Sequence, residues 1–407
     1  MRTDTATATR ATAPDRLPWL RGPLRARVAR VPERAVRAGL VPPSWFGWRW
    51  VREEPLDSVV ARGDALSHER IHQPAVADNP LPRNVARRED LPDEAGWWGY
   101  SMRDVPTRAS GRTLLATLPE RRIVAFTEPS KRNYYPVVLD RRGRSAFLRE
   151  MPFRPGHREA LARGAPVQRR ERVTWIAERV YHNHSHWLTA HVPKLCLLEE
   201  RGLLGDLALP ARSNPAIDAT LRMFGLDPAA VCSIDPDLPL EVGELTLVDT
   251  DRFRPELLRL VRDRLGPVPE RAPWRRVLIS RAKARGRRLE NEAALEPLLA
   301  KAGFESVVME ELSFVEQARL MSETAVLLAP HGAGLTNMIF CRPGTQLVEI
   351  ADLSFPNPNF YALASAMGLG YWLVEGRFCG DPALAPLDRD LAVEPARVEA
   401  VLRALGG

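Results

Sequence analysis

Residues 324–350, with the sequence TAVLLAPHGAGLTNMIFCRPGTQLVEI, decide the fold of this chain. An apolar run, TAVLLAP, ends at a turn that carries two glycines, and a short helical pattern begins at about Gly334. A second apolar run, QLVEI, follows it. Apolar strands joined by helices are typical of a parallel sheet, because parallel neighbours need a crossover connection.

The same alternation extends in both directions from this stretch. Helical spacing occurs at 289–302, 313–322 and 359–367, and a last helix begins at about Glu394. The predicted strands are RRVLIS, SVVME, TAVLLAP, QLVEI and YWLVEG. We therefore predict an α/β domain over 271–390 with helices on both faces of its sheet, followed by a C-terminal helix at 391–407.

The chain before this domain has a different pattern. Over 113–149 an antiparallel β element is predicted by the short runs TLLATL, RIVAFTE, YPVVLD and SAFLRE. Over 172–265 strands alternate with helices, and PVPERAPW then reads as a linker. We assign 113–266 to an N-terminal domain. The preceding 17–112 form an extension that is hard to interpret, and the polar residues 1–16 are predicted to be a disordered tail.

The composition argues against several classes of protein. The net charge is +7, and the 58 basic residues include only four Lys, which leaves 54 Arg. Neither a basic stripe with stacking aromatics nor a nucleic-acid-binding module is present, so we expect no nucleic-acid partner. The four Cys form no C-x-x-C pair, which argues against zinc and a disulfide framework and favours a reducing, cytoplasmic setting. No apolar run is long enough to span a bilayer, and the N-terminus lacks the apolar core of a signal peptide.

Three groups of polar residues follow predicted strands. Ser280 and Arg281 follow VLIS, Glu310 and Glu311 follow SVVM, and the segment HGAG follows VLLAP. In open α/β sheets, ligands bind at the carboxyl ends of the strands. We therefore expect these groups to lie along one edge of the sheet.

Two of these groups predict an anion site. Gly332 and Gly334 lack a Cβ, so the backbone can approach a ligand closely, and the N–H groups of the following helix favour an anion. The nearby segment SRAKARGRRLENE carries four arginines, Arg281, Arg285, Arg287 and Arg288. Arg binds phosphate oxygens with two parallel hydrogen bonds. A tight turn and a solvated basic loop are the simpler alternatives, but two anion-binding elements on one edge favour a ligand.

A histidine cluster lies in the other half of the chain, in YHNHSHWLTAH at 181–191. The spacing of His184 and His186 does not suit one face of a helix, and no carboxylate or Cys completes a zinc pattern. We expect no metal, and we interpret one of these His as a general base and others as structural. The D-x-D tripeptides are treated as chance, although Asp249 and Asp251 follow a strand and could face a cleft.

Several of these segments resemble glycosyltransferase family 61. The similar stretches are VLISRAKARGRRLENE, LSFVEQARLMSETAVLLAPHGAGLTNMIFCRPGTQLVEI and NHSHWLTAHVPKL, and together they span roughly 181–375. That family includes plant xylan-modifying transferases, animal protein O-GlcNAc-type transferases and bacterial capsular polysaccharide-biosynthesis proteins. The resemblance implies an α/β GT-B fold, with two Rossmann-like domains facing across a cleft, here preceded by a partly β extension. It also implies an inverting transfer from a nucleotide-linked sugar, commonly UDP-linked, that does not depend on a metal.

The resemblance and the positions at strand ends together predict the site residues. The donor side comprises Ser280, Arg281, Arg285, Arg288, His331, Gly332, Ala333, Gly334, Leu335, Asn337 and Glu349. The acceptor side comprises Asn183, His184 and Trp187, with His186 as the catalytic base and Asp249 as the alternative base. The family usually has aromatic residues where His184 and Ser185 stand, which is a departure from its pattern.

These observations lead to one expected function and one alternative. We expect an inverting glycosyltransferase that moves a sugar from a nucleotide-sugar donor to a glycan or lipid-linked glycan in bacterial polysaccharide biosynthesis, such as that of a capsule. The nucleotide sugar is a co-substrate, and no cofactor is expected. The expected location is cytoplasmic, with peripheral contact at the inner face of the membrane left open. The alternative is a non-catalytic subunit that binds glycans or nucleotide sugars. A hydrolase is not favoured, because the chain has no G-x-S-x-G motif.

Overall fold

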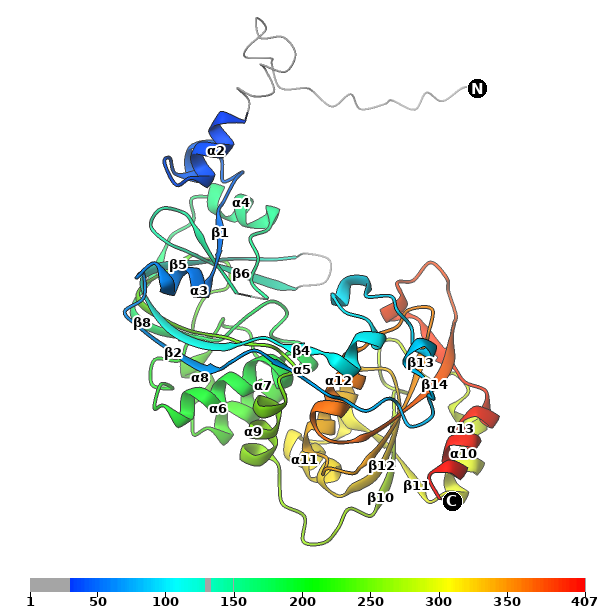
Figure 1. Ribbon diagram of the computed structural model, residues 1–407. Coiled ribbons are helices and arrows are strands. Elements are labelled where there is room, and N and C mark those ends of the chain that lie inside the picture. Colours follow the sequence, from blue (N-terminus) through cyan, green and yellow to red (C-terminus); the bar gives the residue numbers. More distant parts are fainter. Residues whose placement is uncertain (1–29, 129–132, 149, 407) are drawn as a thin grey trace, which may run out of the picture.

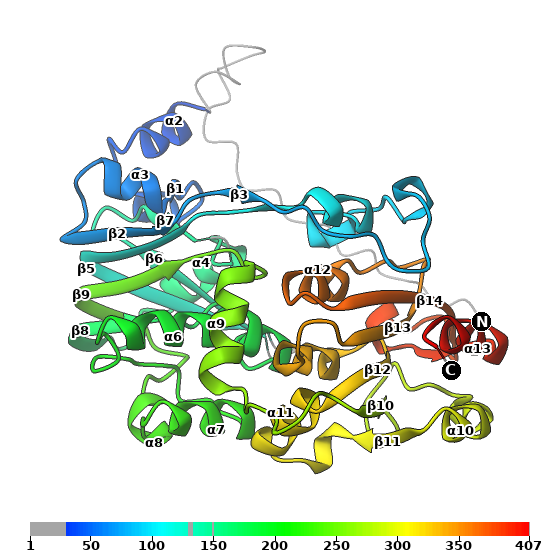
Figure 2. The ribbon, with the colours of Figure 1, turned by 60° about the horizontal axis from the view of Figure 1, so that its bottom comes forward.

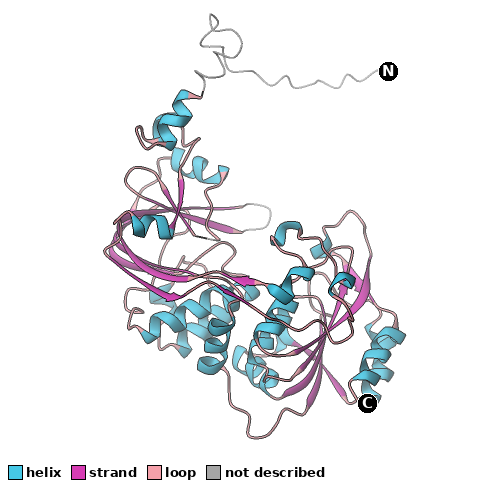
Figure 3. Ribbon diagram, in the orientation of Figure 1, coloured by secondary structure: helices cyan, strands magenta, loops and turns pink. Residues whose placement is uncertain are grey.

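The computed structural model describes residues 30–128, 133–148 and 150–406 (Figure 1). The tail predicted at 1–16 lies outside these residues. The described chain forms two α/β halves, each built around a sheet, and Figure 3 shows the helices packed around both sheets. The two halves are connected by an irregular segment between residues 265 and 275, as the sequence predicted.

The C-terminal sheet has the strand order β11-β10-β12-β13-β14-β15. Its strands are β10 (Arg275–Ser280), β11 (Phe304–Val308), β12 (Thr324–Pro330), β13 (Gln346–Asp352), β14 (Gly370–Cys379) and β15 (Asp390–Ala392). Every pair is parallel except β14–β15, which is antiparallel. The predicted parallel sheet is therefore confirmed. The intervening helices are α10 (Glu292–Lys301), η6 (Met309–Glu311), α11 (Phe314–Ser322), η7 (Ala333–Phe340), α12 (Asn359–Ala366), η8 (Pro386–Asp388) and α13 (Pro395–Ala404).

Both faces of this sheet are covered, which explains why its strands are continuous apolar runs. Successive side chains of a strand point to opposite faces. Accordingly Val277 and Ile279 join one apolar cluster, whereas Leu278 joins another, together with residues of α10 and α13. The first cluster continues through α9 and α7 into the N-terminal sheet, so one apolar core connects the two halves.

The N-terminal sheet is mixed in strand direction. Its order is β1-β7-β6-β5-β9-β8, with β2 also paired to β5. Its strands are β1 (Glu53–Pro55), β2 (Ser67–His72), β5 (Thr113–Thr127), β6 (Tyr134–Leu139), β7 (Ser145–Phe147), β8 (Gln168–Trp175) and β9 (Leu240–Asp249). The antiparallel element predicted over 113–149 is confirmed, because β5, β6 and β7 pair in that way. Short connections allow only antiparallel pairing there, whereas β8 and β9 are parallel and are separated by helices.

Most helices of this half follow β8 in the sequence. They are α4 (Pro155–Ala162), α5 (His184–His186), η5 (Trp187–His191), α6 (Val192–Glu200), α7 (Pro215–Met223), α8 (Pro228–Val231) and α9 (Pro255–Leu265). The helix predicted at 187–201 is present, but η5 forms a π-helical turn at its start. Such single π turns are frequent at functional sites.

The N-terminal extension, which the sequence left uninterpreted, joins the two halves. Its elements are α2 (Val31–Arg37), η1 (Pro43–Phe46), α3 (Leu56–Ala61), β3 (Ala75–Val76), η2 (Arg88–Asp90), η3 (Gly96–Trp98), η4 (Met102–Thr107) and β4 (Ala109–Ser110), together with β1 and β2. Figure 2 shows the segment after β3 crossing from the N-terminal sheet to α12 and β14. There Asn84 exchanges two hydrogen bonds with the backbone of Leu373, and Tyr100 donates to Asn359.

Candidate active site

The strand order of the C-terminal sheet marks where a ligand would bind. From β10 the chain moves to β11 on one side, and it then returns to β12 on the other side. Ligands of open parallel sheets bind at such a switch point, beyond the carboxyl ends of the strands. Here Arg281 follows β10 and His331 follows β12. The structure thus brings together two of the predicted groups.

Arg281 lies directly against Gly332. A Cβ built on Gly332 would lie 2.2 Å from Nη1 of Arg281. Gly332 has an extended backbone, so the guanidinium, and not the backbone conformation, requires a glycine here. At Gly334 the nearest atom to a built Cβ is 3.6 Å away, which is an ordinary contact. Nε of Arg281 donates to the carbonyl of Arg287 at 3.1 Å, and Nη2 donates to that of Gly286 at 2.7 Å.

A second guanidinium lies beside this one. Arg287 has a left-handed backbone, with φ of 58°, and it lines a small pocket together with His331. Burial, and then the nearby Arg281, lower the pKa of Arg287 to about 10. Nε of Arg287 is buried without a hydrogen-bond partner. Within the described part of the chain, no carboxylate forms a salt bridge with Arg281 or Arg287. Two adjacent cations, neither of which forms a salt bridge among the described residues, are what a bound anion would complete.

Other arginines of this loop are directed elsewhere. We expected Arg288 in the donor site, but its guanidinium binds Asp390 at 2.7 Å and is about half exposed. This is a correction: Arg287, the neighbouring residue, points inward instead. Arg285 is exposed, and Ser280 is buried with its Oγ accepting from the N–H of Ala282.

His331 is fixed from both sides by hydrogen bonds. Its Nδ1 contacts Oε1 of Glu349 at 2.5 Å, and the other oxygen of Glu349 accepts from Tyr371 at 2.7 Å. On the opposite side, Nδ2 of Asn357 donates to Nε2 of His331 at 3.0 Å. The Asn357 amide orientation is set because its Oδ1 accepts from Asn359. In this arrangement Nδ1 of His331 faces the carboxylate of Glu349, and Nε2 accepts from Asn357. Glu349 is fully buried, which corrects its expected position in the lining: it supports His331 from behind.

The start of η7 completes this edge. Ala333 and Gly334 are partly exposed, whereas Leu335 is buried in the core and does not line the site. The first N–H groups of a helix have no partner within the helix and favour an anion.

A chain of hydrogen bonds links η7 to the histidine cluster of the other half. Gln317 donates to the carbonyls of Met309 and Leu312, which directs its Oε1 to Nδ2 of Asn337 at 2.9 Å. Oδ1 of Asn337 then accepts from Nε2 of His184 at 2.8 Å. His184 accordingly carries its proton on Nε2, and the Nδ1 lone pair is left available.

His184 is also close to the cationic loop. Burial lowers the pKa of His184, while the Asn337 contact and the charge of Glu310 raise it in part. Glu310 similarly raises the pKa of Arg281, which burial lowers. The charge of the exposed Glu310 thus acts on both His184 and Arg281. Glu310 was expected on this edge from its position at a strand end, whereas no sequence pattern predicted a role for Gln317.

The other members of the histidine cluster have different surroundings. His186 faces Arg252, whose Nη1 is 3.4 Å from Nε2 of His186. Burial, and then Arg252, keep the pKa of His186 well below its ordinary value. His191 is fully buried and structural, because it bonds the backbone of His186 and Glu178.

Two of the remaining acceptor-side residues serve the local fold. Asn183 caps α5, because its Oδ1 accepts from the N–H groups of Ser185 and His186. Trp187 was expected on the acceptor side, but it is fully buried and donates to Thr220. That expectation is corrected: an indole with its N–H satisfied is part of the core.

The two aspartates at the end of β9 both contact arginines. Asp249 is buried and forms a salt bridge with Arg112 at 3.0 Å. Asp251 binds Arg108 at 2.6 Å and accepts from the N–H of Gly111. Neither is a carboxylate open to a ligand, so the expected reserve role of Asp249 has no support in its geometry.

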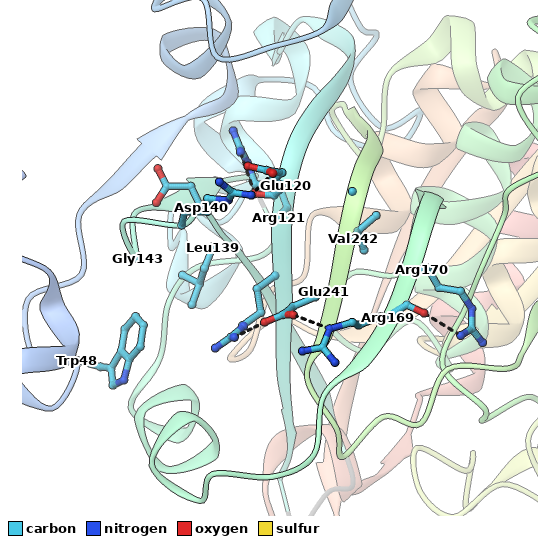
Figure 4. Close-up of a pocket in the computed structure, with 13 residues that line it drawn as sticks. Trp48, Glu120, Arg121, Leu139, Asp140, Gly143, Arg169, Arg170, Glu241 and Val242 are labelled. Atoms are coloured by element: carbon cyan, nitrogen blue, oxygen red, sulfur yellow. Dashed lines mark hydrogen bonds and ion pairs between the residues drawn. The ribbon is translucent and has the colours of Figure 1, made fainter.

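A separate hollow lies at the far end of the N-terminal sheet (Figure 4). It has a volume of about 460 Å³, and its lining includes Trp48, Arg121 and Glu241. Glu241 is shared by Arg122 and Arg169, so much of its charge is already paired. Asp249 lies eight positions further along β9 than Glu241, about 26 Å along the strand, so this hollow is remote from the residues that follow β9.

Two features are absent from the described residues. No helix among them is long and apolar enough to cross a bilayer. No group of three or more His, Cys, Asp or Glu side chains that could hold a metal ion occurs in the same part of the chain.

Comparison with known proteins agrees with the geometry. A family model described as Glycosyltransferase 61 matches residues 184–348, a segment that holds His184, both arginines and His331. A β-1,2-xylosyltransferase of Oryza sativa subsp. japonica, XAX1, is 38% identical over 123 residues, which are 28% of this chain and 21% of that protein. A β-1,2-xylosyltransferase of Arabidopsis thaliana is 33% identical over 75 residues, which are 18% and 14%. The chain therefore matches only about a fifth or less of the length of these relatives.

Proposed function

The chain belongs to glycosyltransferase family 61 through residues 184–348, and from this premise we propose that it transfers a sugar from a nucleotide-sugar donor to a glycan hydroxyl. We further propose a UDP-linked donor, inversion at the anomeric carbon and a GT-B arrangement of the two halves. The bacterial, capsule-related and cytoplasmic setting stays a prediction, because the relatives named above are plant proteins.

One observation carries this proposal: the adjacent arginines Arg281 and Arg287, neither salt-bridged among the described residues, at the switch point of the parallel sheet. When the bond between the anomeric carbon and the diphosphate oxygen breaks, negative charge develops on the diphosphate. Fixed donors that point at this charge stabilise the transition state most, because they need no reorganisation. The pair of guanidinium groups and the start of η7 would supply such donors at one edge.

The acceptor hydroxyl must lose its proton as it attacks, and we propose His184 as the base. Its Nε2–H is committed to Asn337, so Nδ1 is the atom that would accept the proton. This replaces the expected role of His186, because the Nε2 lone pair of His186 faces the cationic Arg252. In this step the hydroxyl oxygen forms a bond to the anomeric carbon, and its proton passes to Nδ1 of His184. The bond from the anomeric carbon to the diphosphate breaks, and the nucleoside diphosphate leaves with the electrons of that bond.

The proposal is tested by binding of a nucleotide to the purified chain. A ligand that binds only the folded state raises the melting temperature. We expect UDP, UDP-xylose or another UDP-sugar to raise the Tm, with UDP-xylose included because the relatives are named xylosyltransferases. No shift with any nucleotide sugar would contradict the proposal. The alternative is a non-catalytic binding subunit. It predicts the same rise in Tm, but no slow hydrolysis of the UDP-sugar to UDP when no acceptor is present.

A further inference from the structure

We propose that Arg252 and its neighbours bind an anionic group, a carboxylate or a phosphate, on the acceptor. The inference rests on the transfer reaction proposed above and adds the chemical class of its acceptor. Arg252 stands just after β9, on the N-terminal half, and was not among the residues expected from the sequence.

Only neutral groups hold the half-buried guanidinium of Arg252. Its Nε donates to Oγ1 of Thr189 at 2.6 Å, and its Nη2 donates to Oγ of Ser185 at 2.8 Å. The third contact is the 3.4 Å approach to His186. The ring of Phe253 lies 4.9 Å from its central carbon. Among the described residues, none of these contacts supplies a negative charge.

Arg252 also lacks a carboxylate of its own. Among the described residues it forms no salt bridge, and Glu150, the carboxylate that acts on it most strongly, is paired with Arg179. Burial lowers the pKa of Arg252 to about 10, so the environment opposes its charge. Removing a cation from water is costly unless a counter-charge joins it. The Ser185 hydroxyl accepts from Arg252, and its own hydrogen can be donated to the same ligand.

The location connects this site with the reaction. Ser185 is the residue next to His184, and consecutive Cα atoms are only about 3.8 Å apart. An anion held by Arg252 and Ser185 would therefore lie on the same sugar residue as the hydroxyl at His184, or on an adjacent one. A uronic acid carboxylate and a sugar phosphate both fit this description.

The test compares the binding of glucuronic acid, glucose 6-phosphate and glucose to the full chain by NMR. UDP is present at saturation, so that the charged sugars cannot occupy the Arg281–Arg287 site. We expect a charged sugar to bind at least about fivefold more tightly than glucose, since hydrogen bonds to charged groups are roughly twice as strong as neutral ones. A preference for glucuronic acid alone identifies a carboxylate, and a preference for glucose 6-phosphate alone identifies a phosphate.

The variants make the assignment specific. Arg252→Gln should abolish the preference and Arg252→Lys should keep part of it, whereas Arg259→Gln, at an exposed position on α9, should not change it. Ser185→Ala should weaken the binding of the charged sugar, and it provides the measurement if Arg252→Gln does not fold. Equal binding of all three sugars, a preference that survives Arg252→Gln, or a preference that appears only when UDP is left out would overturn the inference. Failure of the proposed function has a different signature: UDP gives no Tm shift, while the preference for charged sugars remains.

Discussion

His184 donates from Nε2 to Oδ1 of Asn337 over 2.8 Å, and this hydrogen bond joins α5 of the N-terminal half to η7 of the C-terminal half. The two residues come from opposite sides of the proposed reaction. The bond orients the imidazole in the same way that a third group orients the base of a catalytic triad. The proposed base is therefore positioned by a residue of the other half, Asn337.

Replacing His184 by Ala should lower turnover by about 10²- to 10⁴-fold, the usual contribution of a general base. UDP binding, measured by thermal shift, should be unchanged. Because burial lowers the pKa of His184 below 6.5, the rate of the wild type should be constant near neutrality and should fall only at more acidic pH. Asn337→Ala should shift the pH at which the rate begins to fall, since it removes the hydrogen bond that fixes the tautomer of His184. Turnover of His184→Ala within about threefold of wild type, against the loss expected of a base, would eliminate this role.

Replacing Arg287 by Gln should weaken UDP binding at least about tenfold, because a hydrogen bond to a charged group contributes about 1.5–3 kcal/mol. The adjacent Arg288→Gln is a matched control: its guanidinium is held by Asp390 outside the site. UDP affinity, measured by calorimetry, should fall only in the first variant. In the absence of UDP, Arg287→Gln should not lower the Tm, because it removes a half-buried cation that forms no salt bridge among the described residues. Equal losses of affinity in both variants would mean that Arg287 has no special position.

Gly332→Ala should destabilise the fold, by about 1–3 kcal/mol, as expected when a well-packed site is overfilled. The new Cβ would displace the Arg281 guanidinium and break its bonds to the carbonyls of Gly286 and Arg287. Gly334→Ala adds the same methyl group in ordinary contact, and it should leave the free energy of unfolding of the ligand-free protein nearly unchanged. The comparison is made by urea denaturation of both variants. A Gly332→Ala protein as stable as Gly334→Ala would show that Arg281 is free to move.

Features of the fold that depend on nearby residues could be predicted from the sequence, and features that depend on distant residues could not. The parallel sheet was predictable because strands buried on both faces, such as β10 and β12, must be apolar along their length. The pairing of Arg281 with the HGAG turn followed from the strand ends alone. Which of Arg287 and Arg288 points inward could not be predicted in this way. It depends on the left-handed backbone of Arg287, which no local sequence pattern indicates.

Residues that act over long sequence separations gave no local pattern. Asn84 reaches a strand 289 residues later, and nothing in its neighbourhood predicts this contact. Trp187 was misassigned because an apolar ring next to polar histidines can belong to either a surface or a core. Arg252, by contrast, could have been found, because it follows a strand end, just as Arg281 does.

The free energy of unfolding should decrease as the pH is lowered. The decrease should begin near pH 6.5, above the range in which most carboxylates titrate. Burial lowers the pKa of His157 to about 4 and that of His191 to about 3, against 6.5 for an unperturbed histidine. Both rings are neutral in the fold, since each uses one nitrogen as donor and the other as acceptor to the backbone. Below pH 6.5 the unfolded chain binds protons that the folded chain excludes. The free energy of unfolding therefore decreases as the pH falls, and the full contribution is present only above pH 6.5.

Urea denaturation at pH 7, 6 and 5 measures this dependence. We expect the midpoint to fall steadily over that range, and His157→Gln should show a shallower dependence, because one of the excluded protons is removed from the balance. The informative quantity is the slope with pH, so an overall loss of stability in the variant does not obscure the result. His68→Gln, at an exposed position in β2, is the control and should keep the slope of the wild type. An unchanged slope in His157→Gln would mean that this ring becomes protonated in the folded protein, in contradiction to its two backbone hydrogen bonds.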